Sequence, residues 1–177
     1  FSNEDGSMSD VFYGFIAGLQ KYIPSAMPMF APNVNSYRRF LPNTTAPTNI
    51  DWGIENRTVA LRVPESEPAN RRIENRIPGA DTNPYLAMAA NLLCGLVGIE
   101  EGLKPTLPVS GATGYHLADR LPTSLEAAIE EMENSRMLEE KLGWAFVQAY
   151  AGTRLAEHEA FKEVISSWER EYLMYSV

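Results

Sequence analysis

The sequence predicts an α+β fold in which short antiparallel strands pack with several helices. Apolar residues recur at helical spacing near the start of the chain and again over its C-terminal third. Between them, the segment 52–77 has short β-like stretches separated by turn residues. A chain of 177 residues with 45% hydrophobic content can bury one sizeable core. We therefore expect one domain or part of a larger one.

The first helix is expected to begin at Ser9 or Asp10, because either side chain can cap it, and to run to about Tyr22. The three prolines between 24 and 32 should end it, because proline lacks the backbone donor that a helix needs. The next segment, 33–49, contains two prolines and many small polar residues, so we expect a long surface loop.

Short strands are expected at 52–58, 59–64 and 71–77, and the first two can be separate or form one bent strand. Asn83 and the proline after it are typical of a helix start, and this helix should run to about Glu101. Because the helix is apolar all round, we expect it to be central.

The C-terminal third is expected to be a helical scaffold. A capping box that starts at Thr123 opens one helix, Ser135 begins another, and Gly143 separates it from a long last helix. Apolar residues give this last helix a core stripe as far as Trp168. Between 126 and 171 there are eleven acids and five bases, which is typical of solvated helix faces.

Composition and charge argue against several classes of protein. The net charge of −8 argues against nucleic acid as the main partner, because binding a phosphate backbone takes a basic surface. The longest apolar segment, 84–99, is shorter than the ~20 residues of a membrane span, and the opening residues lack a signal-peptide pattern. The single cysteine, Cys94, suggests a packed thiol in the cytoplasm. Because the chain opens on Phe1, we expect a piece of a longer protein.

Arginine is concentrated in one part of the chain. Seven of the eleven arginines lie between 38 and 76, a segment without lysine. Arginine binds carboxylate and phosphate bidentately and keeps its charge at neutral pH. We interpret this segment as a site for phosphate and carboxylate groups.

A regular third strand would place Glu74 between Arg72 and Arg76 on one face. One interpretation is a row of surface ion pairs without a function. The other is that Glu74 ligates a divalent cation, since Mg²⁺ takes one or two carboxylates together with substrate phosphate. Arg57 and Arg62 can join this site only if the preceding strand bends, because their odd separation points them to opposite faces.

Five segments resemble the C-terminal half of the catalytic domain of the glutamine synthetase family. They are NSYRRFLP at 35–42, AP at 46–47, NRTVALRVP at 56–64, RRIENRIP at 71–78 and NPYLAMAANLLCGLVGIEEGLKP at 83–105. They follow the family order nearly without gaps over about seventy residues. The ending FKEVISSWEREYL is similar to that of the family's glutamate–amine, or γ-glutamylpolyamine, ligase branch. The resemblance implies that residues 1–177 are the C-terminal portion of such a catalytic domain.

The resemblance also implies a role for each arginine of the cluster. Arg39 and Arg76 match arginines that bind substrate glutamate. Arg57 matches the catalytic arginine at the point of phosphate transfer, which contacts both ATP and glutamate. Arg62 and Arg72 match arginines that contact the nucleotide phosphates.

Glu74 matches a glutamate that ligates the metal, Mg²⁺ or Mn²⁺, bridging the phosphates of ATP. The implied reaction transfers phosphate from ATP to the γ-carboxylate of glutamate, after which a nitrogen nucleophile attacks the γ-glutamyl phosphate. The family's other metal ligands lie upstream of the matched segments, so this chain alone is expected to be inactive. The family also implies a homo-oligomeric ring with sites between neighbouring subunits.

Two positions depart from the family pattern. Thr45 stands at the flap position where glutamine synthetases carry a glutamate that takes a proton from ammonium, and a hydroxyl is a poor general base at neutral pH. Ala69 replaces a nucleotide-contacting lysine of many relatives. Tyr115 falls near a tyrosine that some bacterial members modify with a nucleotide, although an ordinary loop tyrosine is the favoured interpretation.

Thr45 and the ending that contains WERE favour a ligase that joins glutamate to an organic amine such as a polyamine or ethanolamine. A true glutamine synthetase that uses ammonia is the first alternative. The second is a catalytically inactive family member, against which the intact arginine cluster argues, because mutual repulsion among unused charges would only destabilise the fold.

Overall fold

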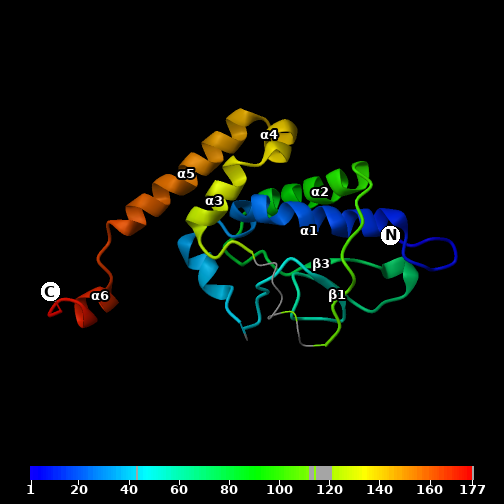
Figure 1. Ribbon diagram of the computed structural model, residues 1–177, viewed down its shortest axis with the longest axis horizontal. Helices are drawn as coiled ribbons and strands as arrows, with labels where there is room; N and C mark the ends of the chain where they lie inside the picture. The colour runs from blue at the N-terminus through cyan, green and yellow to red at the C-terminus, as the bar shows by residue number, and fades with distance from the viewer. Residues whose placement is uncertain (43, 112–113, 115–120, 177) are drawn as a thin grey trace.

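The computed structural model describes residues 1–42, 44–111, 114 and 121–176, and Tyr115 therefore lies outside the described residues. A small sheet lies to one side of the long helices α1 and α2, so the expected α+β class is confirmed (Figure 1). The elements in chain order are α1 (Asp10–Phe30), η1 (Val34–Arg39), β1 (Trp52–Ile54), β2 (Leu61–Val63), η2 (Pro68–Asn70), β3 (Glu74–Asn75), α2 (Pro84–Glu100), α3 (Leu125–Glu133), α4 (Arg136–Leu142), α5 (Trp144–Lys162) and α6 (Ser167–Tyr172).

Helix α1 is longer than its prolines predict. Ser9 caps it by accepting a hydrogen bond from the Phe12 N–H at 3.2 Å, but the helix continues through Pro24 and Pro28. A proline inside a helix costs about 3 kcal/mol. The last turn, 26–30, is buried, and each large apolar side chain buried there contributes about 1.5–3 kcal/mol. Packing therefore outweighs the proline penalty, and the expected end near residue 22 was wrong.

Helices α1 and α2 approach each other closely at glycines. A Cβ built on Gly18 would lie 2.1 Å from the carbonyl oxygen of Cys94 and 2.7 Å from the Cα of Gly98. Cys94 is fully buried at this contact, as expected, and burial raises the pKa of its thiol to about 12. Only residues without a side chain allow the two backbones to come this near.

Helix α2 begins as expected, because Asn83 Oδ1 accepts from the N–H groups of the first turn at 3.0 and 3.3 Å. The expectation that α2 is central holds for only one of its faces. Its other face exposes large apolar residues, namely Tyr85, Met88, Leu92 and Leu96. The apolar residues on all sides of α2 therefore form two apolar faces. The rest of this chain covers one face and leaves the other exposed.

The sheet has the strand order β1-β2-β3, with β2 and β3 antiparallel but β1 and β2 parallel. The expectation of antiparallel pairing was therefore wrong for β1 and β2. The chain leaves β1 at Glu55, where the backbone adopts a positive φ of 49°, and bends through 56–60 before β2 starts. Asn56 holds this bend by donating from Nδ2 to the carbonyls of Val109 and Gly111, both at 2.9 Å.

The segment 33–49 is the expected surface loop only in part, since Leu41, Pro42 and Thr45 are exposed. It opens with the 3₁₀ helix η1 and ends in buried residues, of which Asn49 is fully buried. Asn49 Nδ2 donates to the carbonyls of Thr58 at 2.9 Å and Gly114 at 2.8 Å. Hydrogen bonds from side-chain amides thus take the place of backbone hydrogen bonds between strands, and they hold the loop against the sheet.

The C-terminal helices follow the expected order with two differences. Ser124 rather than Thr123 caps α3, and the last helix ends at Lys162, with α6 as a separate element. The expected core stripe is buried at Val147, but it is exposed from Leu155 onward, as α5 leaves the body of the molecule (Figure 1). Within the described ranges, none of the helices is long and apolar enough to cross a membrane.

Candidate active site

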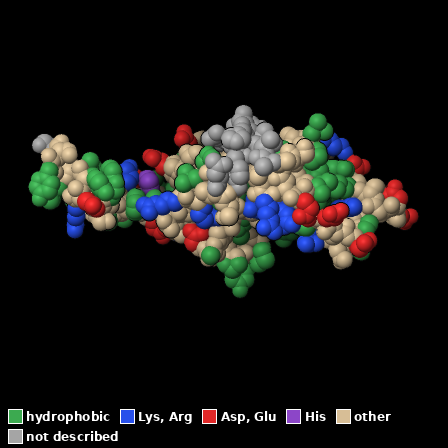
Figure 2. All heavy atoms as spheres, turned by 90° about the horizontal axis from the view of Figure 1, so that it is seen from below, with side chains coloured by type: hydrophobic (Ala, Val, Ile, Leu, Met, Phe, Trp, Pro, Cys, Tyr) green, Lys and Arg blue, Asp and Glu red, His purple; other side chains and the backbone are tan. Residues whose placement is uncertain are grey.

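Four of the residues expected to form the site line one pocket of about 440 Å³, which we call the Arg39 pocket. Its lining residues are Arg39, Thr44, Thr45, Ala46, Glu74 and Arg76. The pocket lies where the chain after η1 meets β3. Seen from below the view of Figure 1, the face of the molecule carries a row of Lys and Arg side chains with acidic side chains beside them (Figure 2).

Arg76 joins three parts of the site. Its side chain is only 12% exposed, and Nη2 donates to the main-chain oxygen of Thr45 at 2.6 Å. Nη1 donates to the main-chain oxygens of Arg57 and of Val59, the latter at 3.2 Å. Nε lies 3.6 Å from Glu74 Oε1. One guanidinium therefore connects the flap position, the bend before β2 and the carboxylate on β3.

Glu74 lies between two guanidinium groups, but Arg72 is not one of them. Arg62 Nη1 lies 2.7 Å from Glu74 Oε2, because the antiparallel register places Arg62 opposite Glu74. Arg62 Nη2 lies 2.8 Å from Glu55, a carboxylate that the sequence interpretation missed. The hydrogen bond from Arg62 lowers the pKa of the Glu55 carboxyl. Strand pairing, which residue spacing along one strand cannot predict, decides the partners of Glu74.

Arg39 is held by contacts outside the strands. Its Nη2 donates to the main-chain oxygen of Ile77 at 2.6 Å, and its guanidinium stacks 4.7 Å from the centre of the Phe40 ring. Gly79 lies beneath it, since a Cβ at that position would come within 3.1 Å of Arg39 Cζ and 2.5 Å of Asp81 Oδ1. The glycine thus leaves the space that the guanidinium occupies.

Asp81 connects η1 to the turn after β3, and the sequence interpretation missed it as well. Its Oδ2 accepts from Ser36 Oγ at 2.5 Å and from Asn33 Nδ2 at 3.3 Å. Burial raises the pKa of the Asp81 carboxyl, but these hydrogen bonds and the nearby charge of Arg39 outweigh burial, so the net shift is downward. Asp81 therefore fixes the 3₁₀ helix that ends in Arg39.

Arg57 and Arg72 lie outside the lining of the Arg39 pocket. Arg57 is exposed in the bend before β2. Because it lies outside a regular strand, the alternation of side chains that would have pointed it away from Arg62 does not apply to it. Arg72 is also exposed, and its Nη1 lies 3.5 Å from the main-chain oxygen of Asn70. The chain thus gathers the expected glutamate-binding arginines around one pocket, whereas the expected phosphate-binding arginines Arg57, Arg62 and Arg72 do not line it.

Glu74 can supply one oxygen ligand to a metal ion. Its side chain is 43% exposed, and a carboxylate offers about four lone-pair positions. The described part of the chain contains no group of three His, Cys, Asp or Glu residues that could hold a metal. The donor set therefore fits a Mg²⁺ ion that takes one carboxylate here and its other ligands from phosphate, water or further protein groups.

Thr45 and Trp52 lie in very different surroundings. Thr45 is exposed at the Arg39 pocket and carries a hydroxyl. Trp52 is 2% exposed, and its Nε1 donates to the main-chain oxygen of Thr106 at 2.8 Å. Trp52 therefore packs in the core, and of the two only Thr45 faces the pocket.

Comparison with known proteins decides the family. The model of the glutamine synthetase catalytic domain matches residues 1–173. The chain belongs to the glutamine synthetase family. It is 39% identical over 175 residues to a glutamate–isopropylamine ligase from Pseudomonas sp., which covers 96% of the chain and 38% of that protein. It is 38% identical over 175 residues to type-1 glutamine synthetase 2 from Dictyostelium discoideum, covering 96% of the chain and 33% of that protein.

Two further relatives are also similar to this chain over only part of their own length. A γ-glutamylethanolamide synthetase from Streptomyces coelicolor is 40% identical over 168 residues, covering 94% of the chain and 36% of that protein. The solved structure of GmaS without ligand superposes with a TM-score of 0.84 at 30% identity, covering 98% of this chain and 40% of that chain. The chain thus spans 33–38% of the length of these three curated relatives. Amine ligases and glutamine synthetases both occur among its relatives.

Proposed function

We propose that this chain is the C-terminal portion of the catalytic domain of an ATP-dependent carbon–nitrogen ligase, which joins glutamate to an organic amine through γ-glutamyl phosphate. The observation that carries the proposal is the Arg39 pocket, in which two arginines and Glu74 surround a space of about 440 Å³. Planar guanidinium groups suit both the carboxylates of glutamate and a transferred phosphoryl group.

In this proposal, Arg39 and Arg76 bind glutamate and hold its carboxylates in the pocket. Arg57 extends from the bend that Arg76 fixes and neutralises charge on the phosphoryl group during transfer, which is where such catalysis gains most of its rate. Arg62 and Arg72 contact the nucleotide phosphates. One solved neighbour, a GmaS complex with ADP, supports nucleotide binding in this fold.

Glu74 would hold Mg²⁺ or Mn²⁺, together with ligands from the phosphates and from outside this chain. When bound, the metal would neutralise phosphate charge. Arg62 already neutralises part of the Glu74 charge through an ion pair of 2.7 Å, and Arg76 adds a second positive charge at 3.6 Å. A metal at Glu74 would therefore share the carboxylate with these arginines.

The choice of an organic amine rests on Thr45. A hydroxyl at the flap position supplies neither the negative charge that attracts ammonium nor a base that deprotonates it at neutral pH. The relatives named for isopropylamine, ethanolamide and putrescine agree with this choice. The alternative, a true glutamine synthetase, is favoured by relatives that carry that name at 38% and 34% identity.

Two further properties belong to the proposal. We expect a homo-oligomer, because the chain leaves one face of α2 apolar and exposed and the family forms rings. We also expect a cytoplasmic protein, which the buried free thiol of Cys94 supports.

The test is the release of phosphate by the full-length protein with ATP, Mg²⁺ and glutamate, measured against ammonium and a panel of amines. The panel should include isopropylamine, ethanolamine and putrescine at equal concentrations. An amine should give the highest kcat/KM. If ammonium is the best nucleophile, the protein is a glutamine synthetase, and if none of the nucleophiles stimulates phosphate release, it is an inactive family member.

A further inference from the structure

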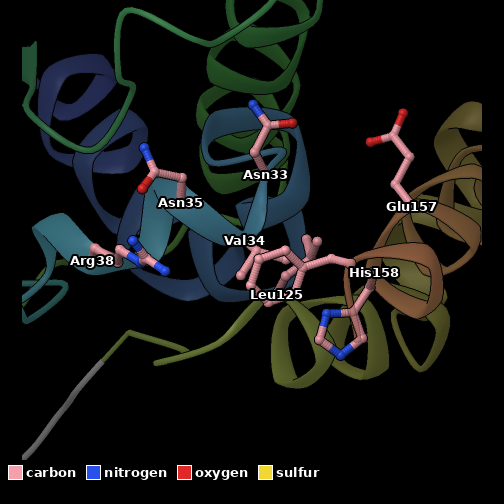
Figure 3. A pocket seen from close by; sticks show the side chains of 8 residues that line it. Asn33, Val34, Asn35, Arg38, Leu125, Glu157 and His158 are labelled. Carbon is pink, nitrogen blue, oxygen red and sulfur yellow. The ribbon is translucent and has the colours of Figure 1, made fainter. Parts of the chain in front are cut away.

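A second pocket lies where α5 passes η1 and the start of α3, and we call it the Arg38 pocket (Figure 3). Its volume of about 330 Å³ lies within the usual range for small-molecule sites, about 300–1,000 Å³. Its lining residues are Asn33, Val34, Asn35, Arg38, Leu125, Glu157, His158 and Phe161.

The Arg38 pocket is separate from the Arg39 pocket, although the residues that name them are adjacent. A 3₁₀ helix has about three residues per turn, so successive side chains point about 120° apart. Arg38 and Arg39 both belong to η1 and consequently line different pockets. Among the described residues, the two linings have no member in common.

Arg38 gives the pocket an uncompensated positive charge. It is exposed, and none of the carboxylates in the described part of the chain forms an ion pair with it. The acid in the lining, Glu157, is already paired with Arg154 at 2.8 Å. A guanidinium without an acidic partner at the mouth of a pocket favours an anionic ligand.

His158 adds a second polar group that lacks a partner. The side chain is only 12% exposed, because it lies between α5 and α3. Its Nε2 is 3.8 Å from Glu126, whereas its Nδ1 is buried with no hydrogen-bond partner within the described ranges. A buried nitrogen of this kind costs free energy unless a bound group or water satisfies it.

The rest of the lining consists of two amides, Asn33 and Asn35, and an apolar wall of Val34, Leu125 and Phe161. Leu125 is 2% exposed and Phe161 is 48% exposed, and Figure 3 shows Val34 and Leu125 close to His158. The pocket therefore combines a guanidinium at one side with hydrocarbon surface at the other. We propose that the Arg38 pocket binds a small organic carboxylate with an apolar body, whose carboxylate pairs with Arg38 and whose hydrocarbon part lies against Leu125 and Phe161.

The direct test is calorimetric titration of the protein with acetate, butanoate and hexanoate. Affinity should rise by about fourfold for each added methylene that is buried. Arg38→Gln should weaken the binding of all three acids by about tenfold, because it removes the charge-assisted hydrogen bonds. Arg136→Gln, which removes an exposed arginine on α4 outside the lining, is the matched control and should bind as the wild type does.

Two further variants locate the bound acid. Phe161→Ala should remove much of the gain from butanoate to hexanoate while leaving acetate unchanged, since only the longer chains reach the apolar wall. Arg76→Gln should leave hexanoate binding unchanged. Loss of binding in Arg76→Gln but not in Arg38→Gln would place the acid in the Arg39 pocket and overturn the proposal, as would affinities that do not depend on Arg38 or on chain length. Because the readout is binding, this result is independent of the proposed ligase activity.

Discussion

Arg76 donates from Nη2 to the main-chain oxygen of Thr45 at 2.6 Å, so a single guanidinium holds the loop that carries the flap position. The same group reaches Glu74 and the bend that carries Arg57. A lysine at this position keeps the charge but cannot make these bonds in the same plane.

We therefore expect Arg76→Lys to lower kcat/KM for glutamate by about 10²-fold, the usual loss when one group that stabilises the transition state is removed. Phosphate release under initial-rate conditions measures the effect, and the thermal unfolding midpoint serves as the control for folding. Turnover close to that of the wild type would show that Arg76 has no role in catalysis.

The flap position can be tested by restoring the acid. Thr45→Glu places a carboxylate on the exposed side of the Arg39 pocket and should raise kcat/KM for ammonium relative to the best amine by about tenfold, because it attracts a cation and supplies a base. Thr45→Gln has the same size without the charge and is the control. An equal change in both variants would mean that side-chain volume, rather than charge, sets the preference.

Glu74 and Glu55 form a matched pair for testing the metal. Both carboxylates contact Arg62, at 2.7 and 2.8 Å, and their side chains are 43% and 45% exposed, but only Glu74 lines the Arg39 pocket. Glu74→Gln should raise the Mg²⁺ concentration for half-maximal activity by about tenfold, in line with the loss of one ligand. Glu55→Gln should leave it unchanged. If both variants shift it equally, the effect comes from Arg62 and not from metal ligation.

Asp81 should make stability depend on pH. Because its carboxyl has a lowered pKa in the folded chain, its stabilising effect is complete above the ordinary value of 3.8 and is lost as the pH falls through the lowered value. Asp81→Asn should therefore reduce the free energy of unfolding by about 1 kcal/mol at neutral pH, a small effect because the charge is exposed. The reduction should be much smaller at a pH below the lowered pKa, where the wild-type carboxyl is itself protonated. Urea unfolding at both pH values measures the difference, and a constant difference would mean that the charge of Asp81 is not involved.

The same variant tests whether Asp81 positions Arg39. Asp81 accepts from Ser36, three residues before Arg39, and so fixes η1. In the full-length protein, Asp81→Asn should raise KM for glutamate while changing kcat little, because it loosens the proposed glutamate-binding residue Arg39 without touching the reacting atoms. A fall in kcat with no change in KM would contradict this role.

Local signals in the sequence predicted the parts of the fold that depend on few residues. Asn83 followed by proline marked the start of α2, and Ser9 marked that of α1, because a cap needs only one side chain and the next turn. The prolines at 24 and 28 misled the prediction, since their local penalty is overcome by burial against residues far along the chain. The parallel pairing of β1 with β2 also gave no local signal.

The features of the site can be separated in the same way, into those set by residue types and those set by packing. The sequence by itself determined its chemistry: arginines without lysine between 38 and 76, Glu74 among them, and a hydroxyl at position 45. Only the tertiary structure decided the partners, because these depend on strand register and on contacts such as Ser36 with Asp81, 45 residues apart. Register pairs Glu74 with Arg62 instead of Arg72, and the turn of η1 directs Arg38 and Arg39 into two different pockets. Residue types specify which groups a site can bind, whereas packing specifies which of them face the same space.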